Sequence, residues 1–142
     1  MLRQISPLVR GALLLLLFSQ LGCSVLLPDS DFRTTLVNRT DRPLIYSAMT
    51  SDAAARSYMA YTFPVDSSTR ESAAFLRPGE SDTLTREEID GEYEPGETLV
   101  FVLYEVNGDT ATWTGTLSMT RKDLEQRHFR VEITQLPIIN AL

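Results

Sequence analysis

Residues 98–118 constrain the fold of this chain more than any other stretch. The run TLVFVLYEV, residues 98–106, is apolar almost throughout, which is typical of a central strand buried on both faces. Asn107-Gly108-Asp109 follows, and asparagine and glycine tolerate the positive φ values of tight hairpin turns. The next segment, TATWTGTLS, alternates in polarity, so the stretch predicts an antiparallel hairpin. The residues expected to share one face of its second strand are Ala111, Trp113, Gly115 and Leu117.

Other short segments also have the composition of strands and are bounded by turn residues. They are residues 32–38, 43–49, 58–65, 71–76, 81–84 and 129–134. The turn Arg77-Pro78-Gly79 predicts either a hairpin between its neighbours or a strand and its exit. Residues 50–64 allow two interpretations, because Ser51 could also cap a short alanine-rich helix.

Signals for helices are few. Thr85-x-x-Glu88 has the spacing of a capping box, and Thr120 is expected to cap a short helix that ends near Arg127. The whole pattern predicts a mainly β chain, a small antiparallel β-sandwich with one or two short helical turns. Its topology is expected to be immunoglobulin-like or transthyretin-like. Trp113, Phe101 and Val131 are expected in its core.

The first 22 residues differ in kind from the rest. Arg3 and Arg10 form a basic leader without acidic residues, Gly11 to Phe18 is uninterrupted apolar sequence, and small or polar residues follow. This order predicts a signal peptide with an N-terminal signal helix. The apolar run is shorter than the roughly 20 residues that span a bilayer. Since Val25-Leu26-Leu27 resumes the apolar character, an uncleaved anchor remains an alternative.

Cys23 is the only cysteine of the chain, so no disulfide can form within it. Its context, Leu21-Gly22-Cys23 behind the apolar run, resembles the lipobox of bacterial lipoproteins. The resemblance implies that the leader 1–22 is cleaved between Gly22 and Cys23 and that Cys23 carries acyl chains such as palmitate. An ordinary cleaved signal is a further alternative. Several chains would anchor the protein firmly, since each buried CH₂ contributes about 0.8 kcal/mol.

The resemblance also implies a place in the bacterial cell envelope. Ser24 follows the cysteine, and the absence of aspartate at that position favours the outer membrane over the inner membrane. The domain is then expected to face the periplasm or the cell surface. The expected organisation after the leader is a lipidated cysteine and tether (23–31), a sandwich domain (32–135) and a tail (136–142).

Charge limits the class of partner. The net charge is −6, and removal of Arg3 and Arg10 with the leader makes it −8. Such a surface repels phosphate backbones, and no Lys/Arg run opposes that average, so nucleic acid is not an expected partner. The expected partners are the membrane, through Cys23, and an envelope protein.

The inventory of chemical motifs is mostly negative. The sequence has no GxSxG, HExxH, paired CxxC or Gly-rich phosphate loop. His128, the only histidine, is expected at a helix-to-strand junction, and the acidic segment 80–97 lacks EF-hand spacing and is expected to be a solvated loop. We therefore expect no catalytic residue, metal or cofactor, and a non-catalytic interaction or structural module. An envelope enzyme that uses His128 or segment 80–97 is the competing hypothesis.

The segment RSYMAYTF, Arg56 to Phe63, is rich in large apolar side chains. On an exposed loop these side chains would form a partner surface or bind a small ligand. In a small domain such residues also commonly fill the core. The members of the predicted partner surface are Tyr58, Met59, Tyr61 and Phe63.

Overall fold

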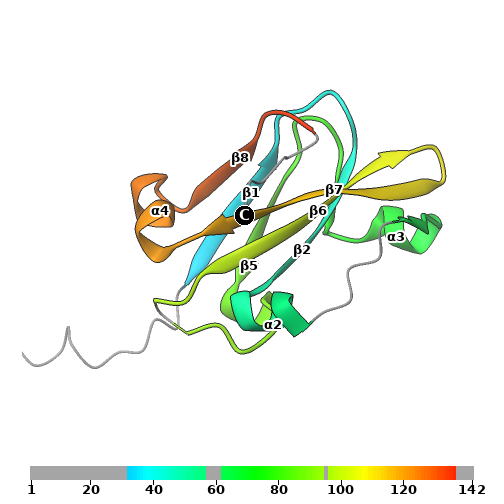
Figure 1. Cartoon of the computed structure of the whole chain (residues 1–142). Coiled ribbons are helices and arrows are strands. Elements are labelled where there is room, and N and C mark those ends of the chain that lie inside the picture. The colour runs from blue at the N-terminus through cyan, green and yellow to red at the C-terminus, as the bar shows by residue number, and fades with distance from the viewer. Residues whose placement is uncertain (1–31, 57–61, 95, 137–142) are drawn as a thin grey trace, which may run out of the picture. The chain divides into compact units, whose positions relative to one another are not determined.

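Eight short strands in the described residues form two sheets that pack face to face (Figure 1). The computed structural model describes residues 32–56, 62–94 and 96–136, all within a compact unit that spans residues 31–142. Side chains from both sheets meet in one hydrophobic core. The predicted fold class, a mainly β chain folded as a small sandwich, is confirmed.

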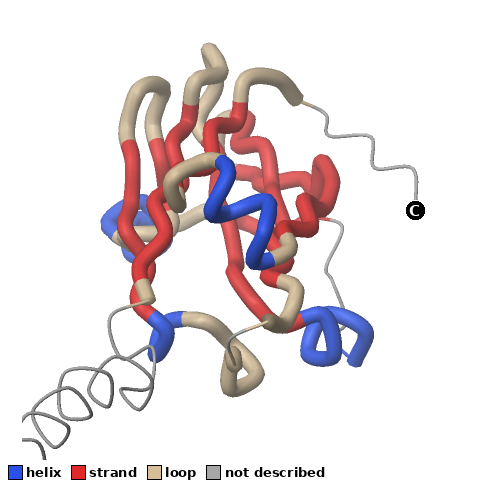
Figure 2. Tube along the Cα trace, turned by 90° about the vertical axis from the view of Figure 1, so that its left-hand side faces the viewer, coloured by secondary structure: helices blue, strands red, loops and turns tan. Residues whose placement is uncertain are grey.

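The strands are β1 (Arg33–Asn38), β2 (Leu44–Thr50), β3 (Thr62–Pro64), β4 (Phe75–Leu76), β5 (Ser81–Thr85), β6 (Leu99–Asn107), β7 (Thr110–Met119) and β8 (Arg130–Ile133). The helices are α2 (Ser51–Arg56), α3 (Ser67–Glu71), the 3₁₀ turn η1 (Arg86–Glu88) and α4 (Arg121–Gln126). Figure 2 shows the strands in red and the short helices in blue around them. The described part therefore has more helical turns than the one or two that the sequence predicted.

The larger sheet has five strands in the order β3-β7-β6-β2-β4 and is antiparallel throughout. β6 lies at its centre, and residues 99–103 of this strand are buried, as the apolar run predicted. The predicted hairpin between β6 and β7 is also confirmed. Asn107 pairs with Thr110, and Gly108 between them has a φ of 57°.

The smaller sheet has three strands in the order β5-β1-β8. β1 is antiparallel to β5 but parallel to β8, and this parallel pairing was not predicted from the sequence. The physical reason is the placement of α4. This helix follows β7 and returns the chain to the beginning of β1, so β8 runs in the same direction as β1 (Figure 1).

The core between the sheets contains two of the three side chains that we expected there. Phe101 and Val131 are both 0% exposed. Tyr46 on β2 is also buried, and its hydroxyl donates a hydrogen bond to Asp82 on β5, so this pair connects the two sheets. Burial, together with the bond to Asp82, raises the pKa of Tyr46 well above its ordinary value.

Asn38, the last residue of β1, is a fully buried polar side chain with four hydrogen bonds. Its Nδ2 donates to the carbonyl oxygens of Arg42 (2.7 Å) and Leu76 (3.0 Å). Its Oδ1 accepts from the backbone N–H (3.0 Å) and the hydroxyl (2.7 Å) of Thr40. Asn38 therefore joins the β1–β2 connection to β4, and its burial is compensated by hydrogen bonding.

Trp113, which we expected in the core, is half-buried and faces away from the core between the sheets. Leu103 pairs with Gly115, but Tyr104 pairs with Trp113, so Thr114 is an extra residue in β7. Such a bulge shifts the alternation of side chains by one position. Gly115 and the residues after it keep the predicted face, whereas Trp113 and the residues before it in β7 lie on the opposite face. The expectation that the four residues share one face was wrong.

The turn Arg77-Pro78-Gly79 does not join a hairpin. β4 before it pairs with β2, whereas β5 after it pairs with β1 in the other sheet, so the hairpin alternative was wrong. Gly79, with a φ of 83°, donates its N–H to the carbonyl of Asn38 (2.7 Å) and so fixes the turn against β1. Residue 71, expected to begin a strand, instead ends α3. That helix forms because Asp66 accepts the N–H of Thr69 (2.8 Å) as its N-cap.

The predicted capping box at Thr85 before η1 and the predicted cap at Thr120 before α4 are both present, and Thr120 also forms a capping box with Asp123. The ambiguous stretch contains a helix and a strand in turn: residues 51–56 form α2, and residues 62–64 form β3. The cap of α2 is Thr50 rather than Ser51, since the Oγ1 of Thr50 accepts the N–H of Ala53 (3.2 Å).

Candidate interaction surface

The face of the five-stranded sheet that points away from the three-stranded sheet, called the outer face below, is apolar as well. Residues of β6 alternate between the two sides, so Val100, Val102, Tyr104 and Val106 lie on this face. Ala53 of α2 packs with Val100 and Val102, so α2 covers part of the outer face. The uniformly apolar sequence of β6 follows from this second apolar layer.

Three half-buried aromatic side chains lie on the outer face and are called the aromatic strip below: Phe63, Tyr104 and Trp113. Tyr104 and Trp113 are direct cross-strand partners, and Phe63 lies opposite Ala111 on the neighbouring strand. The rings of Phe63 and Tyr104 meet edge to face, with centroids 5.0 Å apart. Burial raises the pKa of Tyr104.

Phe63 is the one member of the predicted partner surface that falls in the described part of the chain. It is on β3, an edge strand, and its half-buried ring packs against the apolar cluster of the outer face. Tyr58, Met59 and Tyr61 lie outside the described residues. Tyr104 and Trp113, which lie next to Phe63, were missed by the sequence analysis. The sequence did contain a signal for Tyr104, because the apolar run has large side chains at alternate positions of both kinds and therefore on both faces of β6.

His128 is exposed and lies after the C-terminus of α4, at the predicted junction with β8. Its φ of 52° places it in the left-handed region, where glycine is the usual residue at a helix C-terminus. The N–H of Phe129 donates to the carbonyl of Leu124 (2.7 Å), and the N–H of His128 donates to that of Glu125 (3.0 Å). These bonds form a Schellman motif, so the backbone of His128 terminates the helix.

The acidic segment 80–97 is more structured than the solvated loop that we expected. It contains β5 and η1, and several of its carboxylates accept bonds from nearby backbone groups. Glu88 accepts the N–H of Thr85 (2.7 Å), and Glu97 accepts that of Glu94 (2.7 Å). The bond from the Thr85 backbone lowers the pKa of Glu88. Asp90 pairs through its backbone with β2, since Thr50 donates to its carbonyl (2.9 Å).

The part of the chain that the structure describes contains no candidate metal-binding cluster. No group of three or more His, Cys, Asp or Glu side chains within residues 32–56, 62–94 and 96–136 is arranged to hold an ion. The carboxylates of segment 80–97 are spread over separate turns instead, where they bind backbone N–H groups and arginines such as Arg86.

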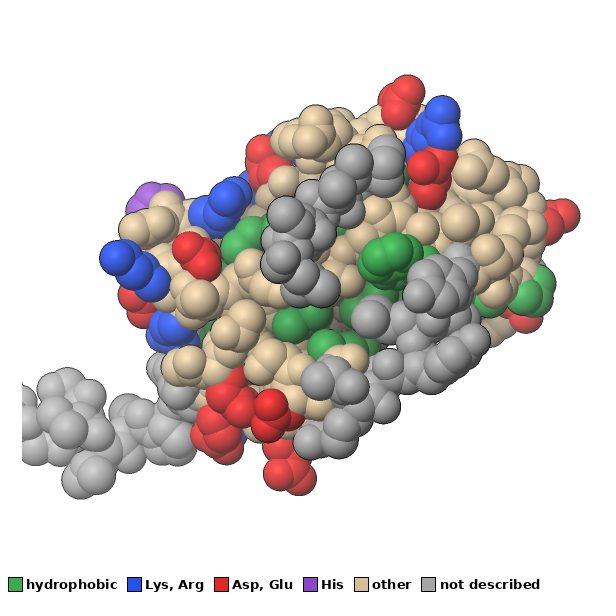
Figure 3. Space-filling model, viewed as in Figure 1, with side chains coloured by type: hydrophobic (Ala, Val, Ile, Leu, Met, Phe, Trp, Pro, Cys, Tyr) green, Lys and Arg blue, Asp and Glu red, His purple; other side chains and the backbone are tan. Residues whose placement is uncertain are grey.

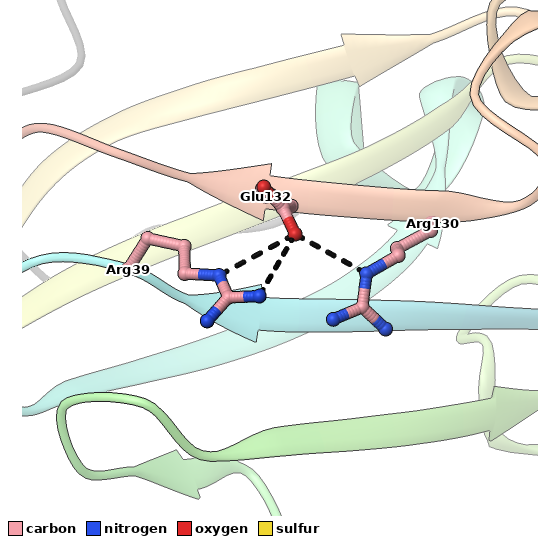
Figure 4. Close-up of polar contacts among 3 residues, drawn as sticks. All are labelled: Arg39, Arg130 and Glu132. Atoms are coloured by element: carbon pink, nitrogen blue, oxygen red, sulfur yellow. Dashed lines mark hydrogen bonds and ion pairs between the residues drawn. The ribbon is translucent and has the colours of Figure 1, made fainter.

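A small charged cluster lies on the solvent face of the three-stranded sheet (Figure 4). The Oε1 atom of Glu132 accepts bonds from the Nη2 of Arg39 (3.3 Å) and the Nε of Arg130 (3.2 Å). The bond from Arg130 and then that from Arg39 lower the pKa of Glu132. Both side chains of the Arg39–Glu132 pair are 40% or more exposed, so solvent screens these ion pairs strongly.

A hollow of about 550 Å³ lies near this cluster and is lined by Arg39, Arg42 and Glu105 among others. Arg42 is paired with Glu105, and Arg39 with Glu132, so the positive charge around the hollow is already neutralised. The aromatic strip is therefore the stronger candidate for recognition, because half-exposed aromatic rings supply a large contact area at low cost in side-chain entropy.

Comparison of the chain with protein-family models, curated proteins and solved structures gives no match. Gly22 and Cys23 lie outside the described residues, so cleavage and lipidation stay predictions. Within the described part, no helix is long and apolar enough to cross a membrane.

Proposed function

We propose that this protein is a lipoprotein of the bacterial cell envelope whose β-sandwich is a non-catalytic interaction or structural module. The single observation that carries the proposal is the leader, a basic start and an apolar run that end at Leu21-Gly22-Cys23. Acyl chains on Cys23 would hold the protein on the membrane, with the outer membrane favoured by Ser24. The sandwich begins only nine residues after this cysteine, so it would stay close to the bilayer surface.

A role in binding is supported by the aromatic strip. A small soluble domain normally places its large apolar side chains in one core, and this domain has a second apolar layer with three half-buried rings. The chemistry of the strip suits an apolar segment of a protein partner. The described titratable groups mainly cap helices or form ion pairs, which supports a non-catalytic role over the competing enzyme hypothesis.

The anchor is tested with Cys23→Ser in the native host, with Ser24→Ala as the matched control. We expect the cysteine variant to keep its leader and to lose acyl labelling, whereas the control is processed and labelled like the unchanged chain. Separation of the membranes by density then locates the labelled protein. Acyl labelling that persists in Cys23→Ser would refute the anchor.

The partner surface is tested by photo-crosslinking in the full chain. A crosslinking residue at Ser118 reports on the outer face, because Ser118 is exposed and pairs with Val100. The same residue at Thr83, an exposed position on the solvent face of the other sheet, is the control. We expect a discrete crosslinked product from Ser118 and none from Thr83. Equal products from both positions, or none from Ser118, would contradict binding through the outer face.

A further inference from the structure

The charge of the domain is distributed unevenly over its surface. Although the chain is acidic, basic side chains gather at one end, where α4 meets the beginnings of β1 and β8; this is called the basic end below. Figure 3 shows His128 and several basic side chains on the left, and acidic side chains gathered along the lower edge. The members of the basic end are Arg33, Arg121, Lys122, Arg127 and Arg130. Three carboxylates lie among them: Asp123, Glu125 and Glu132.

Aromatic contacts hold the parts of the basic end together. The ring of Phe32, just before β1, lies 6.0 Å from the ring of Phe129, just before β8. The guanidinium of Arg121 on α4 lies 5.0 Å from the centre of the Phe129 ring and 6.0 Å from that of Phe32. Residues far apart in the sequence therefore present their cations on one surface.

The free cations of the described part are concentrated there. Of the basic side chains that the structure describes, three are exposed and have no ion pair: Arg33, Lys122 and Arg127. The arginines elsewhere, such as Arg42, Arg70 and Arg77, are each paired with a carboxylate. Asp123 interacts electrostatically with Lys122 and Arg127 and offsets part of their charge, but neither cation is fixed in an ion pair, so both can still attract an external anion.

Phe32, where the tether joins the domain, contacts Phe129 and Arg121 of the basic end. Its ring also lies 4.8 Å from that of Tyr93 in segment 80–97. Phe32 is the first described residue and lies nine positions after Cys23, a span of at most about 30 Å. An anchor at Cys23 would therefore keep the basic end within this distance of the bilayer. Such a tether gives an effective concentration in the millimolar range, so a patch with only a few charges is sufficient for docking.

We propose that the basic end docks on anionic phospholipid headgroups of the membrane that carries the anchor. This inference rests on the proposed lipid anchor. Anionic lipids attract Arg33, Lys122 and Arg127 and repel the acidic edge of the domain, so docking also orients the sandwich. The orientation directs the α4 end toward the membrane and the β6–β7 hairpin, at the opposite end in Figure 1, away from it.

The test uses the full acylated chain in lipid vesicles, with a fluorophore on an introduced cysteine and acceptor dyes in the lipid headgroups. Gln126→Cys on α4, an exposed position, reports on the basic end. Thr110→Cys in the β6–β7 hairpin is the control position. Energy transfer is compared between neutral phosphatidylcholine vesicles and vesicles with about one third phosphatidylglycerol.

We expect transfer from residue 126, but not from residue 110, to rise several-fold on anionic vesicles and to fall again in about 0.5 M salt. The triple variant Arg33→Gln, Lys122→Gln, Arg127→Gln should lose this rise. Each cation near an anionic surface favours docking about fivefold, so the loss of three cations should lower the equilibrium constant for docking about 100-fold. The matched control, Arg42→Gln, Arg70→Gln, Arg77→Gln, removes the same charge elsewhere and should keep the rise.

Two results would overturn this inference while leaving the anchor intact. One is equal transfer on neutral and anionic vesicles by a chain that stays membrane-bound through Cys23. The other is a rise that appears only when envelope proteins are added, which would assign the basic end to an acidic protein. Failure of the proposed function is distinguishable, because the unchanged chain would then carry no acyl label on Cys23.

Discussion

Replacement of Asn38 by alanine should destabilise the domain more than replacement of an exposed asparagine would. The change removes four hydrogen bonds from a side chain that is 0% exposed. The hydroxyl of Thr40 can turn to the carbonyl of Arg42, which is already 2.9 Å away, so three bonds are lost without replacement. At about 0.5–1.5 kcal/mol for each net hydrogen bond, the loss is about 3 kcal/mol.

The assay is urea unfolding followed by the fluorescence of Trp113, the only tryptophan. A loss of about 3 kcal/mol corresponds to a fall in melting temperature of about 10–20 °C for a domain of this size. The matched control is Asn107→Ala, because the side chain of Asn107 is exposed and makes one bond, to Glu105 (3.1 Å). We expect the control to lose less than about 0.5 kcal/mol.

A second variant separates the donors of Asn38 from its acceptor. Asn38→Asp keeps an oxygen toward Thr40 but places a buried oxygen against the carbonyls of Arg42 and Leu76. A carboxylate there has a raised pKa, so its stability relative to the unchanged chain should improve as the pH falls toward 4. An Asn38→Ala domain that unfolds at the same urea concentration as the control would refute the reasoning.

Three further predictions concern titration and the helix ends. His128→Gly should stabilise the domain by about 0.5–1 kcal/mol in thermal unfolding, because glycine adopts a positive φ without strain. A separate activity test addresses the enzyme hypothesis. Hydrolase turnover that disappears in His128→Ala, with an unchanged circular dichroism spectrum, would support that hypothesis. Because the pKa of Tyr46 is raised, its contribution to stability is complete below about pH 10 and is lost as the pH rises further. Tyr46→Phe should remove this alkaline slope. The Thr120 hydroxyl lowers the pKa of Asp123, and the Thr85 backbone lowers that of Glu88. The contributions of these two carboxylates to the stability of the fold are therefore lost as the pH falls below about 4. The double variant Asp123→Asn, Glu88→Gln should make stability depend less on pH in this acid range.

The sequence predicted those features of the fold that depend on local signals. The central strand β6 and its hairpin were predictable because a uniformly apolar run and Asn107-Gly108 are strong signals over short distances. The capping box at Thr85 and the helix cap at Thr120 were predictable for the same reason. The parallel pairing of β1 with β8 was not, because it joins residues about 95 positions apart and leaves no local trace.

The position of Trp113 shows a different limit. Alternation in TATWTGTLS gave no sign of the bulge at Thr114, since threonine is compatible with either face of a strand. The bulge places Trp113 on the outer face instead of in the expected core. The main candidate surface therefore includes Trp113. Phe63 was predicted as part of a partner surface, but its neighbours Tyr104 and Trp113 were assigned only to buried strands.

The pairing of the first strand of the sandwich with its last has a consequence for the order of assembly. β1 occupies the middle of its sheet, and one of its two neighbours is β8, which ends at residue 133 of a 142-residue chain. During synthesis, and during any passage of the chain through a membrane, the amino-terminal strand must therefore wait for the carboxyl-terminal one. The three-stranded sheet cannot close on a nascent chain that is still in transit, whereas the five-stranded sheet, whose strands all lie within residues 44–119, does not need β8.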